Sequence, residues 1–198
     1  MEQARILIVE DEQIVAMDIQ NTLESNGFAV VGRTDRGEDA IAKASELKPD
    51  LILMDISLKG RLDGIESAIQ IRAQFDLPVI FLTAYGNPAI VERARLAAPF
   101  GYIFKPCEER ELISNIQMAL YKHEMDRKVR ESEGKFRGVI EHSADGILLT
   151  DSQGGVIEWN RAVEQITGLE RPQVMGQPLW EVIFRILPRE RRSASVHE

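Results

Sequence analysis

Cysteine is almost absent from this sequence, because Cys107 is the single one among 198 residues. One thiol excludes an internal disulfide framework and a CxxC zinc site, and it suits reducing conditions. Long hydrophobic runs are also missing. Runs such as Pro78–Leu82 fall far short of the roughly 20 residues that a membrane-spanning helix needs, and the first residues have no charged-then-apolar signal pattern. We therefore expect a soluble, cytoplasmic protein that does not act in a membrane.

Basic residues are too few for a general nucleic-acid binder. The chain has 24 Lys and Arg against 32 Asp and Glu, a formal net charge of −8, whereas nucleic acids and anionic membranes select concentrated basic surfaces. The hydrophobic content of 44% is enough for a folded core. The length allows one large domain or two small ones.

Charge divides the chain into three parts. Residues 122–137 carry six basic and four acidic side chains and few apolar ones, which predicts a solvated helix between two more apolar segments. We accordingly expect a first domain over residues 1–122, a connector helix over 123–137 and a partial second domain over 138–198.

The first domain alternates strand and helix patterns. Short apolar runs predict five strands, and apolar residues at helical spacing predict five helices. The strands are Arg5–Val9, Phe28–Val31, Leu51–Met54, Val79–Leu82 and Tyr102–Phe104; the helices are Gln13–Ser25, Gly37–Lys48, Gly64–Gln74, Asn87–Ala97 and a fifth from Glu108 onwards. Five such units predict an α/β fold, a parallel sheet with helices on both faces.

Polar side chains follow four of the predicted strands at the point where each strand ends. They are Glu10, Asp11 and Glu12, then Asp55, then Thr83, and finally Lys105 before Pro106. Ligands of open parallel sheets bind beyond the carboxyl ends of the strands. We therefore expect these side chains to converge on one pocket.

The chemistry of such a pocket follows from its charges. Three carboxylates, Glu10, Asp11 and Asp55, resist joint ionisation unless a cation is present, and Mg²⁺ is a hard ion that takes such ligands together with a phosphate oxygen. Lys105 suits one phosphoryl oxygen as a point charge, and the Thr83 hydroxyl suits another. Asp55 could then act as a nucleophile that forms an acyl phosphate, while Mg²⁺ and Lys105 neutralise the charge that develops.

Four segments in order, "ILIVEDE", "LILMDISL", "VIFLTA" and "GYIFKP", resemble the receiver domain of two-component response regulators over about residues 3–122. The resemblance implies a doubly wound (βα)5 fold of strand order 2-1-3-4-5, as in flavodoxin. It implies Asp55 as the phosphoryl acceptor and Glu10 and Asp11 as the acidic pair beside Mg²⁺. The backbone carbonyl of Ser57 would complete the protein ligands of the metal.

The resemblance also implies how the domain is used. Thr83 and Tyr102 match the family's switch pair, Lys105 matches its invariant cation, and the Lys105-Pro106 bond is expected to be cis. The phosphoryl donor would be a sensor histidine kinase. The receiver would catalyse only its own phosphorylation and dephosphorylation, so we expect no conventional enzyme. A homodimer could form through the face built by the fourth helix, fifth strand and fifth helix, or through the connector helix.

One loop departs from the commonest receiver pattern. The segment DISLKGRLDG has no proline, and Asp63 lies one position later than usual. A subclass of receivers shares this form, so the phosphorylation prediction stands. The resemblance does not determine the shape of this loop or the surface that it offers to a partner.

Plainer interpretations compete at several positions. Asp55 could cap a turn, Tyr102 could be ordinary core, and Cys107 is expected to be inert. His123 lies on what we interpret as a solvated helix face rather than in a kinase phosphorylation motif. A weak seam at heptad-like spacing could be a dimer coil or a packed helix; its members are Met118, Met125, Val129, Ser132 and Phe136.

Residues 136–184 resemble the first half of a PAS domain through "DGILLTDSQGGVIEWNRA" and "VMGQPLWEVI". We expect strands at Gly146–Thr150 and Val156–Trp159, and a helix at Asn160–Thr167. A PAS core has a five-stranded antiparallel sheet, of which only two strands are found here, without a haem, flavin or light-sensing motif. We therefore expect a fragment of a longer signalling protein.

Two strands leave an apolar face without its usual cover. We place Ile147, Leu149, Ile157 and Trp159 on that face. Two other functional interpretations stay open. One is the N-terminal regulatory part of a hybrid histidine kinase. The other is a PAS ligand-sensing module in which the receiver is a dimerising scaffold.

Overall fold

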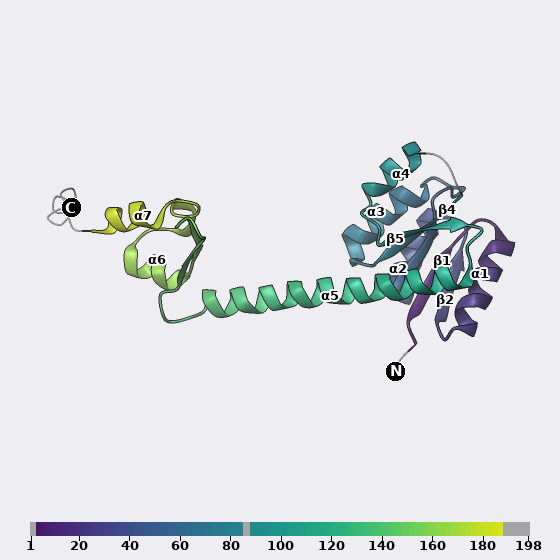
Figure 1. Cartoon of the computed structure of the whole chain (residues 1–198), viewed down its shortest axis with the longest axis horizontal. Helices are drawn as coiled ribbons and strands as arrows, with labels where there is room; N and C mark the ends of the chain where they lie inside the picture. Colours follow the sequence, from purple (N-terminus) through teal and green to yellow (C-terminus); the bar gives the residue numbers. More distant parts are fainter. Residues whose placement is uncertain (1–2, 85–87, 188–198) are drawn as a thin grey trace. The chain divides into compact units, whose positions relative to one another are not determined.

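The computed structural model describes residues 3–84 and 88–187. The chain divides into two compact units, and the division lies between Arg127 and Lys128. Within the described ranges, no helix is both long and apolar enough to cross a membrane. Figure 1 shows the elements of both units.

The first unit contains a five-stranded parallel sheet in the order β2-β1-β3-β4-β5, which confirms the predicted fold class. Its strands are β1 (Arg5–Val9), β2 (Ala29–Thr34), β3 (Leu51–Asp55), β4 (Val79–Ala84) and β5 (Gly101–Lys105). The helices are α1 (Gln13–Ser25), α2 (Gly37–Leu47), α3 (Gly64–Phe75), α4 (Pro88–Arg95) and the first part of α5 (Glu109–Glu141), which continues into the second unit. The order reverses at β1, so the edge beyond the carboxyl ends of β1 and β3 is where a ligand site is expected.

Side chains of the central strands alternate between two hydrophobic clusters. In β1, Leu7 and Val9 pack with α2, α3 and α4, while Ile6 and Ile8 pack with α1 and the first part of α5. All four are fully buried. Because successive side chains of a strand point to opposite faces, a continuous apolar run fills both layers at once.

A glycine sets the path of the chain between β3 and α3. A Cβ on Gly64 would lie 1.9 Å from the carbonyl oxygen of Asp55, so no other residue fits without moving the backbone. Next to it, Asp63 caps α3: its Oδ1 accepts from the Glu66 amide at 2.9 Å, and the Glu66 carboxylate accepts from the Asp63 amide at 3.1 Å. The loop that follows Asp55 is therefore held firmly at its far end.

α5 is a single helix of 33 residues. The predicted connector helix over 123–137 lies wholly inside it. The expected cis bond between Lys105 and Pro106, just before α5, is present.

The second unit is a small α+β arrangement. An antiparallel pair of β6 (Leu148–Thr150) and β7 (Val156–Trp159) packs with α6 (Arg161–Thr167), a 3-10 turn η1 (Arg171–Gln173) and α7 (Leu179–Ile186). The buried core is aromatic and β-branched; its members are Val156, Trp159, Val163, Val174 and Val182.

The prediction that Trp159 shares an uncovered face with Ile157 is wrong. Trp159 is 1% exposed, whereas Ile157 is 49% exposed. The ladder passes from the Leu149–Glu158 pair to the Thr150–Val156 pair, so Ile157 is the extra residue of a β-bulge. The bulge breaks the two-residue period and turns both Val156 and Trp159 toward the core.

Asn160 connects three elements of the second unit. Its buried side-chain oxygen accepts from the amides of Ile147 (2.9 Å) and Val163 (3.1 Å), and its Nδ2 donates to the carbonyls of Ile140 (2.8 Å) and Asp145 (2.9 Å). The amide thus uses all its ordinary hydrogen-bonding capacity. The end of α5 is in this way fixed to the start of the β-hairpin and of α6.

Candidate functional site

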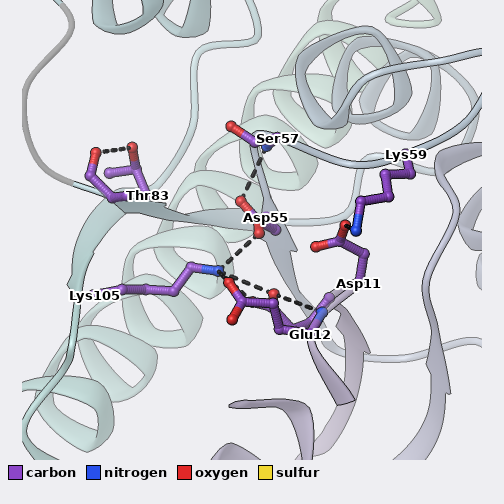
Figure 2. Close-up of polar contacts among 9 residues, drawn as sticks. Asp11, Glu12, Asp55, Ser57, Lys59, Thr83 and Lys105 are labelled. Atoms are coloured by element: carbon purple, nitrogen blue, oxygen red, sulfur yellow. Dashed lines mark hydrogen bonds and ion pairs between the residues drawn. The ribbon is translucent and has the colours of Figure 1, made fainter. Parts of the chain in front are cut away.

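Three of the predicted site residues meet at the carboxyl ends of the strands. Asp55 is the last residue of β3, Glu10 follows β1, and Lys105 is the last residue of β5. Lys105 Nζ lies 2.7 Å from Asp55 Oδ2 (Figure 2). It also lies 2.8 Å from Glu10 Oε2. Residues that are 95 positions apart therefore form one hydrogen-bonded group.

The acidic side chains of this group are held away from water. Glu10 is 3% exposed and Asp55 is 4% exposed. Burial is the main reason why the pKa of Glu10 is raised, and the negative charge of Asp55 raises it further against the opposing effect of Lys105. Burial by itself disfavours the charged form of Lys105, but the hydrogen bonds with Asp55 and Glu10, together with the attraction of their negative charges, outweigh burial and raise the pKa of Lys105. Lys105 is therefore a permanent cation at neutral pH.

Backbone amides orient the two buried carboxylates. The Ser57 amide donates to Asp55 Oδ1 at 3.0 Å, and the Glu12 amide donates to Glu10 Oε1 at 3.2 Å. Asp55 thus has one oxygen on a backbone amide and the other on the Lys105 ammonium. A charged acceptor in such a setting is preorganised, because no water has to be rearranged around it.

The donor set fits a hard divalent ion. Carboxylate oxygens of Glu10, Asp11 and Asp55 lie within 4.8 Å of one another, and oxygen ligands of this kind suit Mg²⁺. The contact of Ser57 here is made by its amide, so the part of its carbonyl as a metal ligand stays a prediction.

Among the described residues, the hydroxyls of Thr83 and Tyr102 do not join this hydrogen-bonded group. Thr83 is buried at the end of β4, and its hydroxyl donates to the Ala84 carbonyl at 3.1 Å. The Tyr102 ring stands 6.0 Å from the Phe81 ring, centroid to centroid. Within the described residues the Tyr102 hydroxyl is buried without a hydrogen-bond partner, and burial raises the pKa of Tyr102. The predicted switch roles stay predictions.

Three charged residues that the sequence analysis did not single out support this edge of the sheet. Lys59 lies 3.0 Å from Asp11, and Arg93 of α4 lies 2.7 Å from the α3 cap Asp63. Glu38 of α2 accepts from the Arg61 amide at 3.4 Å. Hydrogen bonds from backbone amides lower the pKa of Glu38; the amide of Glu38 itself has the largest effect, and those of Arg61 and Leu62 add to it. The sequence could have indicated Lys59, because a lysine in the loop directly after Asp55 is placed to meet the acidic group. In contrast, no residue near Glu38 in the sequence indicates that its partner is the Arg61 amide.

Two plainer interpretations can be compared with the structure. Cys107 is half-buried, and burial raises the pKa of its thiol, which disfavours the reactive thiolate. His123 does not lie on a fully solvated face as expected. Its ring packs edge-on against Phe100 at 5.5 Å, and its Nε2 lies 3.8 Å from Asp76.

The family model described as "Response regulator receiver domain" matches residues 6–117. The chain belongs to the response regulators of two-component signalling. A second family model, for the PAS fold, matches residues 134–195. The predicted limit at 122 lies between the two matches and the one at 137 lies inside the second; both limits stay predictions.

A curated relative and two solved structures are consistent with this family assignment. The transcriptional regulatory protein PdtaR of Mycobacterium tuberculosis is 33% identical over 150 residues, which are 76% of this chain and 71% of that protein.

Two crystal structures resemble the first unit. The receiver domain of a modulated diguanylate cyclase from Desulfovibrio desulfuricans is 39% identical, with a TM-score of 0.61, over 63% of this chain and 99% of that one. The N-terminal domain of a response regulator/sensory box/GGDEF protein from Carboxydothermus hydrogenoformans is 41% identical, with a TM-score of 0.57, over 62% and 98%.

Proposed function

We propose that the receiver domain accepts a phosphoryl group on Asp55 from the phosphohistidine of a sensor kinase, in a reaction that requires Mg²⁺. The observation that carries this proposal is the contact of Asp55 with Lys105 at 2.7 Å beside the carboxylates of Glu10 and Asp11. In the transfer, an Asp55 oxygen forms the new bond to phosphorus while the phosphorus–nitrogen bond of the donor breaks. The electron pair of the broken bond stays on the histidine nitrogen.

The residues of the chain have separate parts in this step. The Ser57 amide keeps the Asp55 carboxylate oriented. The Lys105 ammonium can move from Asp55 to a phosphoryl oxygen because the side chain of lysine is flexible. Thr83 has a hydroxyl at the end of the neighbouring strand for another phosphoryl oxygen. Glu10, Asp11 and Asp55, with the Ser57 carbonyl, would hold Mg²⁺, which when bound neutralises charge on the transferred group.

The output of the step is conformational. A phosphoryl group adds negative charge and acceptor oxygens at the strand ends, to which Thr83 and Tyr102 would respond. α5 begins four residues after Lys105 and ends at Glu141, where Asn160 fixes the Ile140 carbonyl to the PAS domain. A continuous helix is a physical route from the receiver to the PAS domain. The chain would act in the cytoplasm, without nucleic acid, and on no substrate other than its own phosphoryl group.

A second copy of the chain is the partner that the exposed side chains favour. On α5, exposed apolar residues recur near heptad spacing: Met118, Val129, Phe136 and Val139. Leu96, after α4, is 78% exposed, and Phe104 of β5 is 40% exposed. We include in the proposal a homodimer through the connector part of α5 or through the face of α4, β5 and α5. Sedimentation at several concentrations, with and without a phosphoryl analogue, tests it, and a monomer throughout contradicts it.

Phosphorylation is tested by intact-mass measurement. A small phosphodonor with Mg²⁺ should add one phosphoryl group to the full chain, and Asp55→Asn should abolish the addition. Thr83→Ala is a useful companion variant, because it leaves the acceptor in place. Equal labelling of Asp55→Asn and the wild-type chain would contradict the proposal.

A further inference from the structure

A lysine of the β3–α3 loop reaches the third carboxylate of the site. Lys59 Nζ lies 3.0 Å from Asp11 Oδ2, and Figure 2 shows the side chain directed at Asp11 from the side away from Lys105. The Lys59 side chain is 87% exposed, whereas that of Asp11 is only 11% exposed. The three carboxylates are thus shared between two ammonium groups: Lys105 faces Glu10 and Asp55, and Lys59 faces Asp11.

The loop is held in the shape that makes this contact. Leu58, directly before Lys59, is buried in the core between the sheet and α3. After it, the Arg61 amide donates to Glu38, and a Cβ on Gly60 would lie only 3.0 Å from Glu38 Oε2. Lys59 therefore stands between two anchored points, so that little backbone freedom is lost when its ammonium meets Asp11.

An ammonium in this place must affect a divalent ion. Mg²⁺ binds carboxylate oxygens at about 2.0–2.1 Å, so an ion on Asp11 would come within a few ångströms of the Lys59 charge if Lys59 stayed. Two cations at such a separation repel, and the repulsion is moderate because Lys59 is in contact with water. Either Lys59 leaves Asp11 or the ion binds less tightly.

We propose that Lys59 is a positioning residue that competes with Mg²⁺ for Asp11 and lowers the affinity of the receiver for the ion. The inference rests on the proposed function, because it assumes that Glu10, Asp11 and Asp55 hold Mg²⁺. It adds that the loop which departs from the commonest receiver pattern sets the Mg²⁺ concentration at which the site fills. When Mg²⁺ binds, the Lys59 ammonium has to leave Asp11, and this loss of the ion pair is the cost that weakens Mg²⁺ binding.

Mg²⁺ titration of the full chain tests the proposal, with amide NMR shifts of residues near β1 as the readout. Lys59→Ala should lower the Kd by roughly two- to fivefold at low ionic strength, and the gain should shrink in about 0.5 M monovalent salt, where exposed charges are screened. Lys59→Arg should stay near the wild-type Kd.

Arg61→Ala is the matched control. It removes the same charge from the same loop, but the contact of Arg61 with the fold is made by its backbone amide, and among the described residues Lys59 is the cation paired with Asp11. A much smaller change in Kd for Arg61→Ala supports the direct contact, whereas equal changes in the two variants overturn it in favour of net charge alone.

Two further outcomes also decide the matter. An unchanged or weaker Mg²⁺ affinity in Lys59→Ala overturns the competition while leaving the metal site intact. If the wild-type chain does not respond to Mg²⁺ and behaves like a Glu10→Gln, Asp11→Asn double variant, the metal site of the proposed function fails, and the competition fails with it.

Discussion

Removing the Lys105 ammonium should make the stability of the receiver depend strongly on pH. Lys105 is the cation shared by two almost fully buried carboxylates, at 2.7 Å from Asp55 and 2.8 Å from Glu10. Lys105→Ala leaves both charges buried without a counter-ion. Breaking a buried pair in this way typically costs about 3–5 kcal/mol, and the 14% exposure of the Lys105 side chain favours the lower end.

The sign of the pH dependence follows from Glu10. Its pKa in the folded chain is already raised above the ordinary 4.5, first by burial, and loss of Lys105 must raise it further. A raised folded pKa contributes stability that is fully present below the unfolded value and is lost as pH rises through the folded value. The loss of folding stability caused by Lys105→Ala should therefore be small near pH 4 and reach its full size at neutral pH.

Thermal melting followed by circular dichroism measures this. For a domain of this size, 3 kcal/mol corresponds to a drop in Tm of roughly 10–15 °C. Adding Glu10→Gln to Lys105→Ala should restore part of the loss at pH 7, because the double variant no longer buries two adjacent charges. The same deficit at pH 4 and pH 7, or no recovery in the double variant, would refute the reasoning. If Lys105→Ala keeps a native circular-dichroism spectrum but is not phosphorylated, the role of Lys105 in phosphoryl transfer is separated from its role in folding.

Two other substitutions have outcomes that the structure defines. Gly64→Ala places a Cβ 1.9 Å from the Asp55 carbonyl oxygen, so we expect chemical unfolding to show a loss of stability of at least about 2 kcal/mol, with slower phosphorylation of Asp55. The control is Gly134→Ala in α5, where a Cβ meets nothing and the change should be neutral or slightly stabilising. Equal effects of the two substitutions would contradict the close approach of Gly64 to Asp55. Asn160→Ala leaves four backbone partners without their bonds, at a cost of about 2–5 kcal/mol. Limited proteolysis should then cut after about residue 135 faster than in the wild-type chain, with a resistant receiver left behind, and unchanged cleavage would contradict a structural role for Asn160.

Much of the receiver could be predicted from the sequence because its signals are local and repeated. Each buried strand is a short apolar run, and in a parallel sheet the ends of such runs lie along one edge. The convergence of Glu10, Asp55 and Lys105 follows from that rule without knowledge of any side-chain rotamer. The helix predicted at Asn160–Thr167 is α6, which begins one residue later, at Arg161, with Asn160 as its N-cap.

Features that depend on tertiary packing were not predictable. Trp159 is buried because a bulge at Ile157 breaks the alternation of the strand and because Val174 and Val182, from later segments, cover it. The contact of Lys59 with Asp11 depends on where the loop runs, and that path is set by Glu38 of α2 and by the close approach of Gly64 to β3. Hydrophobic periodicity determines which face of an element is buried, since it repeats along the chain. The pairing of charges across a loop is decided only when distant segments have packed, since a difference of a few ångströms in the backbone determines whether an ammonium reaches a carboxylate.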